Sequence, residues 1–349
     1  MGAMSDTAVR TGRERSAAPA RGIVVAIDGG GTKTDAVALD ETGAVVAHVR
    51  LGPSDVHPGR EGESVSVVDE AVQRVRTEAG GAPLLRVGVF LSGLDHEAEV
   101  AAYRARILPL PWFRGDDGVD AHLENDTFAL LRTGTLAADA VAVVCGTGLN
   151  AIGVRADGAT ARFLAWGAVS GDWGGGTDLG TEALRLAARA LDGRGPATVL
   201  TAAIPPRIGR PDLATLIEDV HFGRIREERL SELVPAVFAA AAEGDAVACA
   251  LVQRQAGEIV GMAASAARRL GLERARIPVV LGGGMIAARL PLLLDDVRRG
   301  LAEQLPNAVP TVIDARPVVG AGLALLEQRG APDAVLRRAR TAIERAVAA

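Results

Sequence analysis

One supersecondary unit occurs twice in this chain, and the repeat limits the possible folds more than any other feature of the sequence. Each copy is an apolar segment, a glycine-rich turn, a second apolar segment, a turn that ends in glycine and a third apolar segment, starting at residue 23 and again at residue 140. The spacing between the two turns is similar, from Asp28 to Gly43 in one copy and from Cys145 to Gly158 in the other. This duplication predicts an α/β fold in which each half is a mainly parallel sheet with helices on its faces.

Hydrophobic periodicity predicts the remaining elements. Val65, Val68, Val72 and Val75 recur at spacings of three and four, the pattern of an amphipathic helix within 61–79. By the same reasoning we expect strands at 84–91, 119–123, 276–285 and 311–314, and helices at 96–107, from 125, at 245–270 and at 333–348. Helices should dominate the stretch between 176 and 270.

At 349 residues the chain is long for one domain, so we expect two. The predicted N-terminal domain covers 22–130, the C-terminal domain with a helical insertion covers 131–325, and the helix in 326–349 packs back on the first domain. Residues 1–21 carry charge without an apolar segment, which predicts a disordered tail and not a signal peptide, and "MGAM" is typical of a cloning remnant.

The composition excludes several classes of protein. A hydrophobic fraction of 48% and a charged fraction of 23% fit a globular protein, and a net charge of -5 without a basic run argues against nucleic acid as a partner. No segment approaches about 18 consecutive apolar residues, so no membrane span is expected. Cys145 and Cys249 are too few for a disulfide framework or a cysteine metal site, which favours a reducing cytoplasm.

Glycine clusters are the most prominent local feature. Each of the four follows an apolar strand or precedes a helix: 29–31, 146–148, 282–284 and 320–322. Glycine exposes backbone N–H groups with no side chain in the way, so such turns can bind phosphate oxygens, although any single cluster is equally consistent with an ordinary turn. Four clusters at corresponding ends of strands favour phosphate binding.

The common nucleotide motifs do not fit the first cluster. A Walker loop requires glycine directly before Lys-Ser/Thr, whereas Thr32 precedes Lys33 here. A dinucleotide fingerprint leads into a helix, whereas residues 29–34 lead into a strand. The turn is therefore predicted to lie in a β-hairpin.

Four segments, "IDGGGTKTDAVALD", "CGTGLNAIG", "WGAVSGDWGGGTDLGTEAL" and "VVLGGGM", together resemble the N-acetylglucosamine kinase / BadF-BcrA-type ATPase family of the actin, sugar-kinase and Hsp70 superfamily. The resemblance extends from about Ile23 to about Leu326. It implies two duplicated ribonuclease-H-like (actin-like ATPase) domains with ATP in the cleft between them. It also implies Mg²⁺, a small sugar substrate and a homodimer.

The same resemblance assigns the nucleotide site. Both glycine hairpins would grip phosphates and the turn at 282–285 would bind adenosine, which gives the candidates Gly29, Gly30, Gly31, Thr32, Lys33, Gly146, Thr147, Gly148, Gly283 and Gly284. Asp28 would hold Mg²⁺, usually through water, and the metal would offset phosphate charge during transfer. The alternative for Asp28 is an Asp that caps the turn.

Asp126 is the candidate catalytic base. It lies where a strand passes into a helix, and the resemblance aligns it with the acid that faces the sugar hydroxyl in related kinases. A carboxylate there can orient the hydroxyl and accept its proton. The alternative is a helix N-cap, but Asn125 could serve as the cap and leave Asp126 free.

The sugar site is implied by the resemblance alone. Its candidates are Ser92, Asp55, Asp126, Asn150, Trp166, Gly167 and Asp172, while Trp173 is as easily a core residue. Asp55 departs from the family, which commonly has Asn there. An Asp would still bind hydroxyls but could prefer an amine, so the preference for an N-acetyl group is open. His57 beside it is expected to be an exposed loop residue.

Three functions compete at this stage. The first is an ATP-dependent kinase that phosphorylates a hydroxyl, such as the 6-OH, of a hexose or an amino sugar such as N-acetylglucosamine or glucosamine. The second is an ATPase that drives electron transfer, as the dehydratase activators of the family do with a cysteine-bound iron–sulfur cluster, but two cysteines give no evident ligand set. The third is a sugar-responsive regulator, for which residues 1–21 are too short and irregular to supply a DNA-binding domain, or a silent binding protein, which Asp126 and Asp28 argue against.

Overall fold

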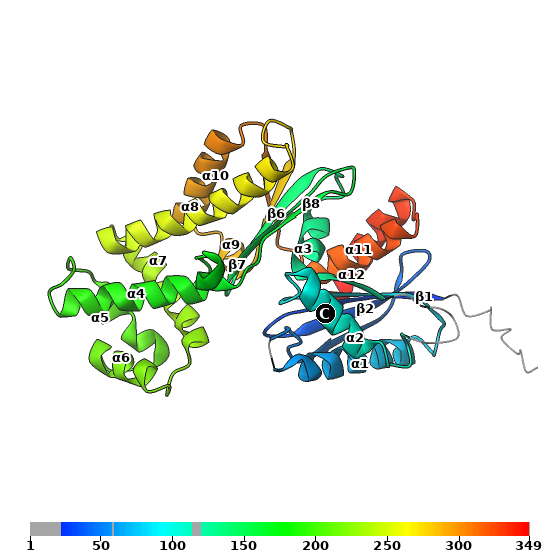
Figure 1. The fold of residues 1–349 in the computed structure, drawn as a ribbon, viewed down its shortest axis with the longest axis horizontal. Helices are drawn as coiled ribbons and strands as arrows, with labels where there is room; N and C mark the ends of the chain where they lie inside the picture. The colour runs from blue at the N-terminus through cyan, green and yellow to red at the C-terminus, as the bar shows by residue number, and fades with distance from the viewer. Residues whose placement is uncertain (1–21, 58, 114–118, 120, 349) are drawn as a thin grey trace, which may run out of the picture.

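Two five-stranded sheets carry the repeat (Figure 1). The computed structural model describes residues 22–348 except 58, 114–118 and 120, so the predicted tail at 1–21 lies outside the described residues. The strand orders are β3-β2-β1-β4-β5 and β10-β9-β6-β7-β8, which correspond strand for strand and confirm the predicted duplication. The strands are β1 (Ile23–Gly29), β2 (Thr34–Asp40), β3 (Val45–Leu51), β4 (Leu84–Leu91), β5 (Ala121–Asn125), β6 (Ala140–Cys145), β7 (Leu149–Val154), β8 (Thr160–Arg162), β9 (Pro278–Gly282) and β10 (Val309–Val312).

The expectation of mainly parallel sheets is wrong. In each sheet the first three strands are antiparallel, and only the pairings β1–β4, β4–β5, β6–β9 and β9–β10 are parallel. The reason is the connections: short turns join the first three strands of each copy, and a short turn can join only antiparallel neighbours. The predicted hairpin at the first glycine turn is confirmed, because β1 and β2 are antiparallel with Gly29 opposite Thr34.

Helices connect and cover the sheets. They are α1 (Glu61–Glu78), α2 (Glu97–Ile107), α3 (Asp126–Gly134), α4 (Gly176–Leu191), α5 (Leu200–Ala203), α6 (Leu213–His221), α7 (Val234–Ala242), α8 (Ala246–Arg269), α9 (Gly284–Ala287), α10 (Pro291–Gln304), α11 (Pro317–Gln328) and α12 (Asp333–Ala348), with 3-10 helices at Gly167–Ser170, Pro205–Ile208 and Glu227–Leu233. The predicted helices at 61–79, 96–107, 245–270 and 333–348 each match one of these within a residue.

The first sheet is covered on both faces, as its alternating side chains require. Ile23, Val25 and Ile27 of β1 join the core formed with α1 and α2, whereas Val24 and Ala26 face α11 and α12. Helices α11 and α12 come from the end of the chain, so the C-terminal segment returns to the N-terminal lobe (Figure 1).

The second sheet packs on a large helical region. Buried residues of β6, β7 and β9 share one core with α4, α7, α8 and α10, and most of these helices belong to the 115-residue stretch that separates β8 from β9. In Figure 1 this region forms the lobe on the left and top, away from the first sheet.

Helix α3 lies between the two lobes. Ala129 packs in the core that contains α11 and β1, while Leu130 and Leu131 pack against β6, β7 and β9. A helix buried on both sides is held firmly, so the residues at its N-terminus have a fixed position at the junction of the lobes.

No single helix in the described part of the chain is long and apolar enough to cross a membrane. One bent pair, Glu227–Ala242 with Ala246–Arg269, meets the length and composition criteria only when its two members are taken together, at an angle of 114°.

Candidate active site

Charged side chains form a row at the glycine-turn end of the first sheet. Asp28 continues the set of β1 side chains that face α11, and it pairs in register with Asp35 of β2, which pairs with Arg50 of β3. Adjacent residues in register lie on the same face of a sheet. The row therefore places Asp28 and Asp35 side by side, next to the first glycine turn.

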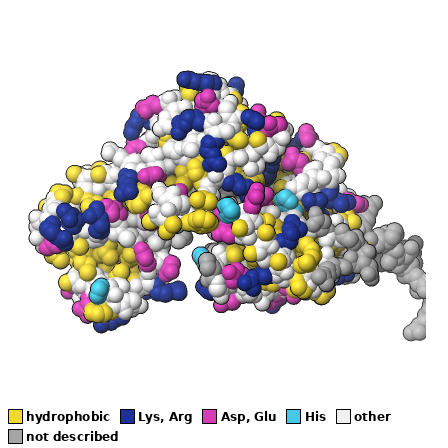
Figure 2. Space-filling model, viewed as in Figure 1, with side chains coloured by type: hydrophobic (Ala, Val, Ile, Leu, Met, Phe, Trp, Pro, Cys, Tyr) yellow, Lys and Arg dark blue, Asp and Glu magenta, His cyan; other side chains and the backbone are white. Residues whose placement is uncertain are grey.

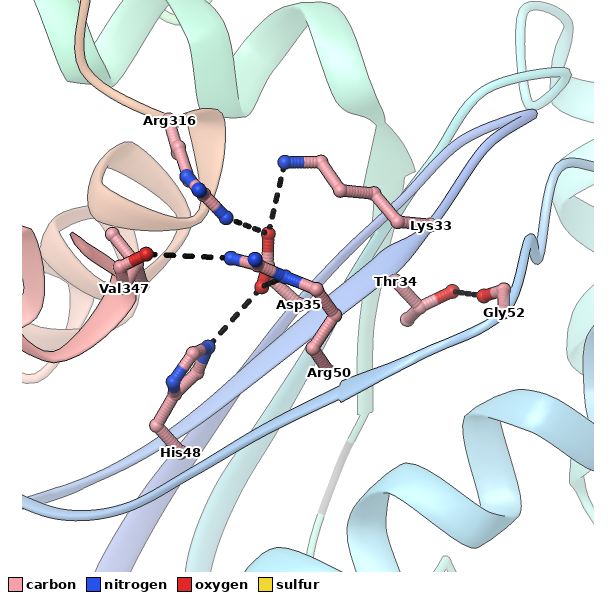
Figure 3. Close-up of polar contacts among 8 residues, drawn as sticks. All are labelled: Lys33, Thr34, Asp35, His48, Arg50, Gly52, Arg316 and Val347. Atoms are coloured by element: carbon pink, nitrogen blue, oxygen red, sulfur yellow. Dashed lines mark hydrogen bonds and ion pairs between the residues drawn. The ribbon is translucent and has the colours of Figure 1, made fainter. Parts of the chain in front are cut away.

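Asp35 is fully buried and surrounded by cations (Figure 3). Its Oδ1 lies 2.8 Å from Arg50 Nε and 3.1 Å from His48 Nε2, and its Oδ2 lies 3.3 Å from Lys33 Nζ and 3.5 Å from Arg316 Nη1. Burial alone would raise the pKa of Asp35, but hydrogen bonds from His48 and Arg50 and the charge of Lys33 outweigh it and hold that pKa below 3.8. Asp35 thus fixes the ammonium group of Lys33 beside the glycine turn.

Asp28 has the opposite environment. Burial, the negative charge of Asp126 and that of Asp35 raise its pKa well above 3.8, and Lys33 opposes this only in part. Two carboxylates that approach each other in a partly desolvated place favour a bound proton or a cation between them. The site therefore has unbalanced negative charge where the resemblance places the metal.

Asn125, and not Asp126, is the N-cap of α3, as the sequence predicted. Asn125 caps α3, because its side-chain oxygen accepts a hydrogen bond from Thr127 N at 2.9 Å and another from the Thr127 hydroxyl. Asp126 is the first residue of the helix, and burial raises its pKa to about 6. A carboxylate with such a pKa holds a proton more readily than an exposed Asp and remains largely ionised at neutral pH, which suits a general base.

The first glycine turn contacts the loop that follows β3. A Cβ on Gly29 would lie 2.0 Å from Ser54 Oγ, so only glycine fits there, and Gly31 lies near Asp55 Oδ2. Gly30 has open space where a Cβ would stand, whereas a Cβ on Gly31 would be in ordinary contact with Asp55 Oδ2 at 3.7 Å. Asp55 Oδ2 lies 2.5 Å from Nε2 of the exposed His57.

Backbone hydrogen bonds of Ser92 connect the first glycine turn to the loop that follows β3. Its N–H donates to Gly29 O at 3.0 Å and its carbonyl accepts from Val56 N at 2.8 Å. Asp55 and Ser92 are therefore both adjacent to the first glycine turn, and we find no described side-chain hydrogen bond for the Ser92 hydroxyl.

The second hairpin meets two further glycine segments. Gly176 N donates to Gly146 O at 2.8 Å and Thr177 N to Thr147 O at 3.0 Å, which fixes the N-terminus of α4 to this turn. Gly283 has φ +94°, and a Cβ there would lie 2.4 Å from Cys145 O. Both hydrogen bonds occupy the N–H groups of Gly176 and Thr177, so α4, whose role the sequence did not predict, holds the backbone of this turn in place.

The fourth glycine cluster is not a phosphate turn. Gly320, Ala321 and Gly322 lie inside α11 and are buried. A Cβ on Gly320 would lie 1.9 Å from Ala129 O, so this glycine allows α11 and α3 to pack closely. The expectation that 320–322 resembles the other three clusters is wrong, because a close helix crossing selects small residues just as a turn does.

A cavity of about 480 Å³ opens on the side of the site that faces the second lobe. It is lined by Asp95, His96, Glu97, Arg162, Phe163, Leu164, Ser170, Asp172 and Arg269. Of the predicted sugar residues only Asp172 lines it, and Ser170 donates a hydrogen bond to Asp172. Figure 2 shows the molecule hollowed between the two lobes on the face displayed.

Three contacts cross from one lobe to the other around this cavity. Asn150 Nδ2 of β7 donates to Asp95 Oδ1 at 2.7 Å, Trp166 Nε1 donates to Glu99 Oε1 at 3.2 Å, and Arg162 Nη2 lies 2.8 Å from Glu124 Oε1. Trp166 is half-exposed at 48%, and Gly167 begins the 3-10 helix that follows it. Trp173 lies beneath Arg254, whose guanidinium is 3.8 Å from the ring centre, and packs against the core.

Asp95 and Arg316 are the residues that the sequence did not single out. Asp95 follows the end of β4, and Gly29, Leu91 and Asn125 lie in register at the ends of β1, β4 and β5. The carboxyl ends of adjacent parallel strands meet at one edge, which is where α/β folds place their ligands. That rule could have identified Asp95 as a candidate site residue, whereas no local sequence pattern indicates that Arg316 contacts Asp35.

The described residues contain no group of three or more His, Cys, Asp and Glu side chains arranged to hold a metal ion. Mg²⁺ in nucleotide-dependent enzymes is commonly held by one or two carboxylates, with water and substrate phosphates completing the coordination. The raised pKa of Asp28 beside Asp126 fits such a cation, because a positive charge would compensate both carboxylates.

Residues 25–324 match the sequence profile of a family described as the BadF/BadG/BcrA/BcrD ATPase family. Among curated proteins, the chain is 27% identical to an N-acetyl-D-glucosamine kinase of Dictyostelium discoideum over 88% of this chain and 98% of the relative. It is 24% identical to an N-acetylmuramic acid/N-acetylglucosamine kinase of Clostridium acetobutylicum over 81% and 92%.

Among solved structures, the chain resembles a candidate N-acetylglucosamine kinase from Chromobacterium violaceum. The TM-score is 0.65 at 25% sequence identity, and the match covers 88% of this chain and all of the other. The similarity therefore spans both sheets and the connections that position the residues described above.

Proposed function

The chain belongs to the BadF/BadG/BcrA/BcrD ATPase family, and from this premise we propose that it is an ATP-dependent kinase for a hexose or an amino sugar such as N-acetylglucosamine or glucosamine. The acceptor would be a hydroxyl, with the 6-OH as the first candidate. The observation that carries the proposal is Asp126, whose carboxylate has a raised pKa. Asp126 is the first residue of α3, between the lobes, but Asn125 and not Asp126 caps that helix. The names of the two curated relatives support the same reaction.

The two hairpins would hold the nucleotide. Within the described residues, no hydrogen bond engages the N–H groups of Gly31 and Thr32 in the first hairpin or those of Thr147 and Gly148 in the second. The N–H groups of Gly30 and Gly146 instead close their own turns by donating to Lys33 O and Gly148 O. Backbone N–H groups presented this way bind phosphate oxygens without the cost of ordering a side chain. Lys33, fixed by Asp35, adds a positive charge to the first hairpin.

Asp28 would hold Mg²⁺ through water. When bound, the ion supplies positive charge that offsets the charge of the phosphates during transfer. Asp28 suits this role because Asp126 and Asp35 raise its pKa and only Lys33 compensates it.

Asp126 would act on the acceptor. Its carboxylate would accept a hydrogen bond from the sugar hydroxyl, orient the oxygen towards the γ-phosphate and take the proton as the new O–P bond forms. Asp172 and Ser170 line the cavity on the facing lobe, where they would hold other hydroxyls of the ring. Closing the lobes would exclude water, which otherwise competes as phosphate acceptor.

The electron-transfer alternative is disfavoured by the cysteines. Cys145 is fully buried beneath the second hairpin, and burial raises the pKa of its thiol to about 12. A cluster ligand must be a thiolate. Cys249 is half-buried in α8, where its thiol donates to Ala241 O at 3.4 Å.

Two further features complete the proposal. Both cysteines are free, in keeping with a reducing cytoplasm, and the family resemblance supports a homodimer without nucleic acid or membrane partners. Light scattering of the purified chain would measure the oligomeric state directly.

A coupled ADP-release assay tests the proposed reaction. With MgATP, the chain is offered glucosamine, N-acetylglucosamine, N-acetylmuramic acid and glucose in parallel, and ADP release without sugar serves as the baseline. We expect at least one sugar to raise the rate well above that baseline. Sugar-independent ATP hydrolysis across the whole panel would reject the kinase and leave the ATPase alternative.

A further inference from the structure

We propose that Asp95 determines which sugar is accepted, by receiving a hydrogen bond from one ring substituent of the acceptor. The proposal rests on the kinase function proposed above and adds a residue to it. A carboxylate can only accept hydrogen bonds when ionised, so Asp95 would select a sugar with a donor, either a hydroxyl or an ammonium group, at the ring position it faces.

Both lobes fix one oxygen of Asp95. Its Oδ1 accepts hydrogen bonds from Asn125 Nδ2 at 2.8 Å and from Asn150 Nδ2 at 2.7 Å. Asn125 belongs to the first lobe and is the residue that caps α3 beside Asp126, whereas Asn150 lies on β7 of the second lobe. The carboxylate therefore has one orientation when the lobes are in contact, and that orientation is linked to the position of the proposed base.

The backbone around Asp95 is equally constrained. Asp95 N and His96 N both donate to Glu99 Oε2, at 3.0 and 2.8 Å, in the capping box that begins α2. Gly93 has φ +86°, and a Cβ there would lie 2.1 Å from Val56 O, so the loop is packed against its neighbour. A side chain held this firmly loses little entropy when a ligand binds.

The second oxygen remains for a ligand. Asp95 lines both the cavity of about 480 Å³ and the small space behind it, and no other described residue forms a hydrogen bond with its Oδ2. Asp172 and Ser170 line the same cavity from the second lobe. A sugar ring in this cavity would thus lie between the carboxylates of Asp95 and Asp172, which would bind different substituents of the ring.

The test compares Asp95→Asn with the wild type on glucose and its 2-deoxy, 3-deoxy and 4-deoxy analogues. Burial, Asp126 and Glu99 raise the pKa of Asp95 to about 7, so assays at about pH 8 keep the wild-type carboxylate ionised. In the wild type, removing the hydroxyl that faces Asp95 should lower kcat/KM about tenfold or more, because a hydrogen bond to a charged group is lost. In the variant, that same analogue should be used about as well as glucose, with the KM for ATP unchanged.

Two variants separate this role from a structural one. Asp95→Glu keeps the charge but moves it, so it should raise the KM for the sugar while leaving the melting temperature near that of the wild type. Asp192→Asn, a change at an exposed residue of the second lobe, should alter nothing. If Asp95→Asn discriminates against every deoxy analogue as strongly as the wild type does, the proposal is overturned. A wild type without any sugar-dependent turnover would instead overturn the kinase function on which it rests.

Discussion

At the scale of single residues, the carboxylates at the end of the first sheet differ in how their charge is compensated. Asp35 has three cationic neighbours, a hydrogen bond with His48 and a pKa below 3.8, whereas burial raises the pKa of Asp95 to about 7 and that of Asp126 to about 6. The compensated carboxylate stabilises the fold, and the uncompensated ones favour a ligand that carries donors or positive charge.

Replacing Asp35 by Asn should therefore destabilise the protein. Lys33, Arg50 and Arg316 would lose their common anion, at a cost of about 2 kcal/mol, since these three cations are partly exposed and water screens them. Thermal unfolding at pH 7 measures the effect. Asp157→Asn breaks an exposed pair with Arg155 and is the matched control, with no expected change in melting temperature.

The pH dependence of the melting temperature provides a second test of the role of Asp35. The folded pKa of Asp35 is lowered, so its stabilising contribution is present in full above the unfolded value of 3.8 and is lost as the pH falls through the folded value. The melting temperatures of the wild type and Asp35→Asn should converge below pH 3.8. A difference in melting temperature that stays constant as the pH falls below 3.8 would show that charge is not the reason for the loss.

The rate should depend on pH through Asp126. Its pKa of about 6 means that the base is ionised above that pH and protonated below it. With the MgATP concentration held constant, kcat/KM for the sugar should level off only above about pH 7, where Asp95 is ionised as well, and should fall about tenfold for each pH unit below pH 6. A flat profile between pH 5 and 8 would exclude Asp126 as a base with this pKa.

At the scale of elements, α3 determines the geometry of the site. It begins at Asp126, is capped by Asn125, and packs against both α11 and the second sheet. Its contact with α11 depends on Gly320, whose N–H donates to Thr133 Oγ1 at 3.0 Å. A displacement of α11 would therefore move the carboxylate of Asp126, the proposed base.

Gly320→Ala tests that contact. The new Cβ would lie 1.9 Å from Ala129 O and 2.3 Å from Thr133 N, so the helices must separate, at a cost of at least about 2 kcal/mol. We expect lower stability by urea unfolding and lower kcat. Gly257→Ala, in α8 with no atom within 4 Å of the new Cβ, should instead stabilise by about 0.5–1 kcal/mol. Equal effects of the two changes would contradict the packing role of Gly320.

The features that could be predicted from the sequence are those that depend on residues close together in the chain. The β1–β2 hairpin and the Asn125 cap follow from a turn and from neighbouring residues, and both are present. Asp95 acquires its position only from the parallel register of β1, β4 and β5, and Arg316 reaches Asp35 across 281 positions of sequence. Neither position can be recognised from neighbouring residues in the sequence. The glycines of α11 could not be distinguished from turn glycines either, because their role depends on contacts with α3, which is distant in sequence.

At the scale of the whole molecule, two lobes meet around α3 and the cavity beside it. The C-terminal helices α11 and α12 connect the two lobes. They follow the last strand of the second sheet in the chain and pack on the first sheet. Asn150, Trp166 and Arg162 of the second lobe contact Asp95, Glu99 and Glu124 of the first. These contacts are side-chain hydrogen bonds and an ion pair, so the lobes can separate to admit a sugar and close over it.

The most direct test of the account is phosphate transfer from [γ-³²P]ATP to the best sugar of the panel, measured for the wild type and Asp126→Asn with ATP affinity determined by calorimetry. Asn125 caps α3 in both, so the variant should fold and bind ATP as the wild type does. The account predicts that transfer slows by about 10²-fold or more, because no group takes the proton of the hydroxyl. Full turnover by Asp126→Asn would contradict it.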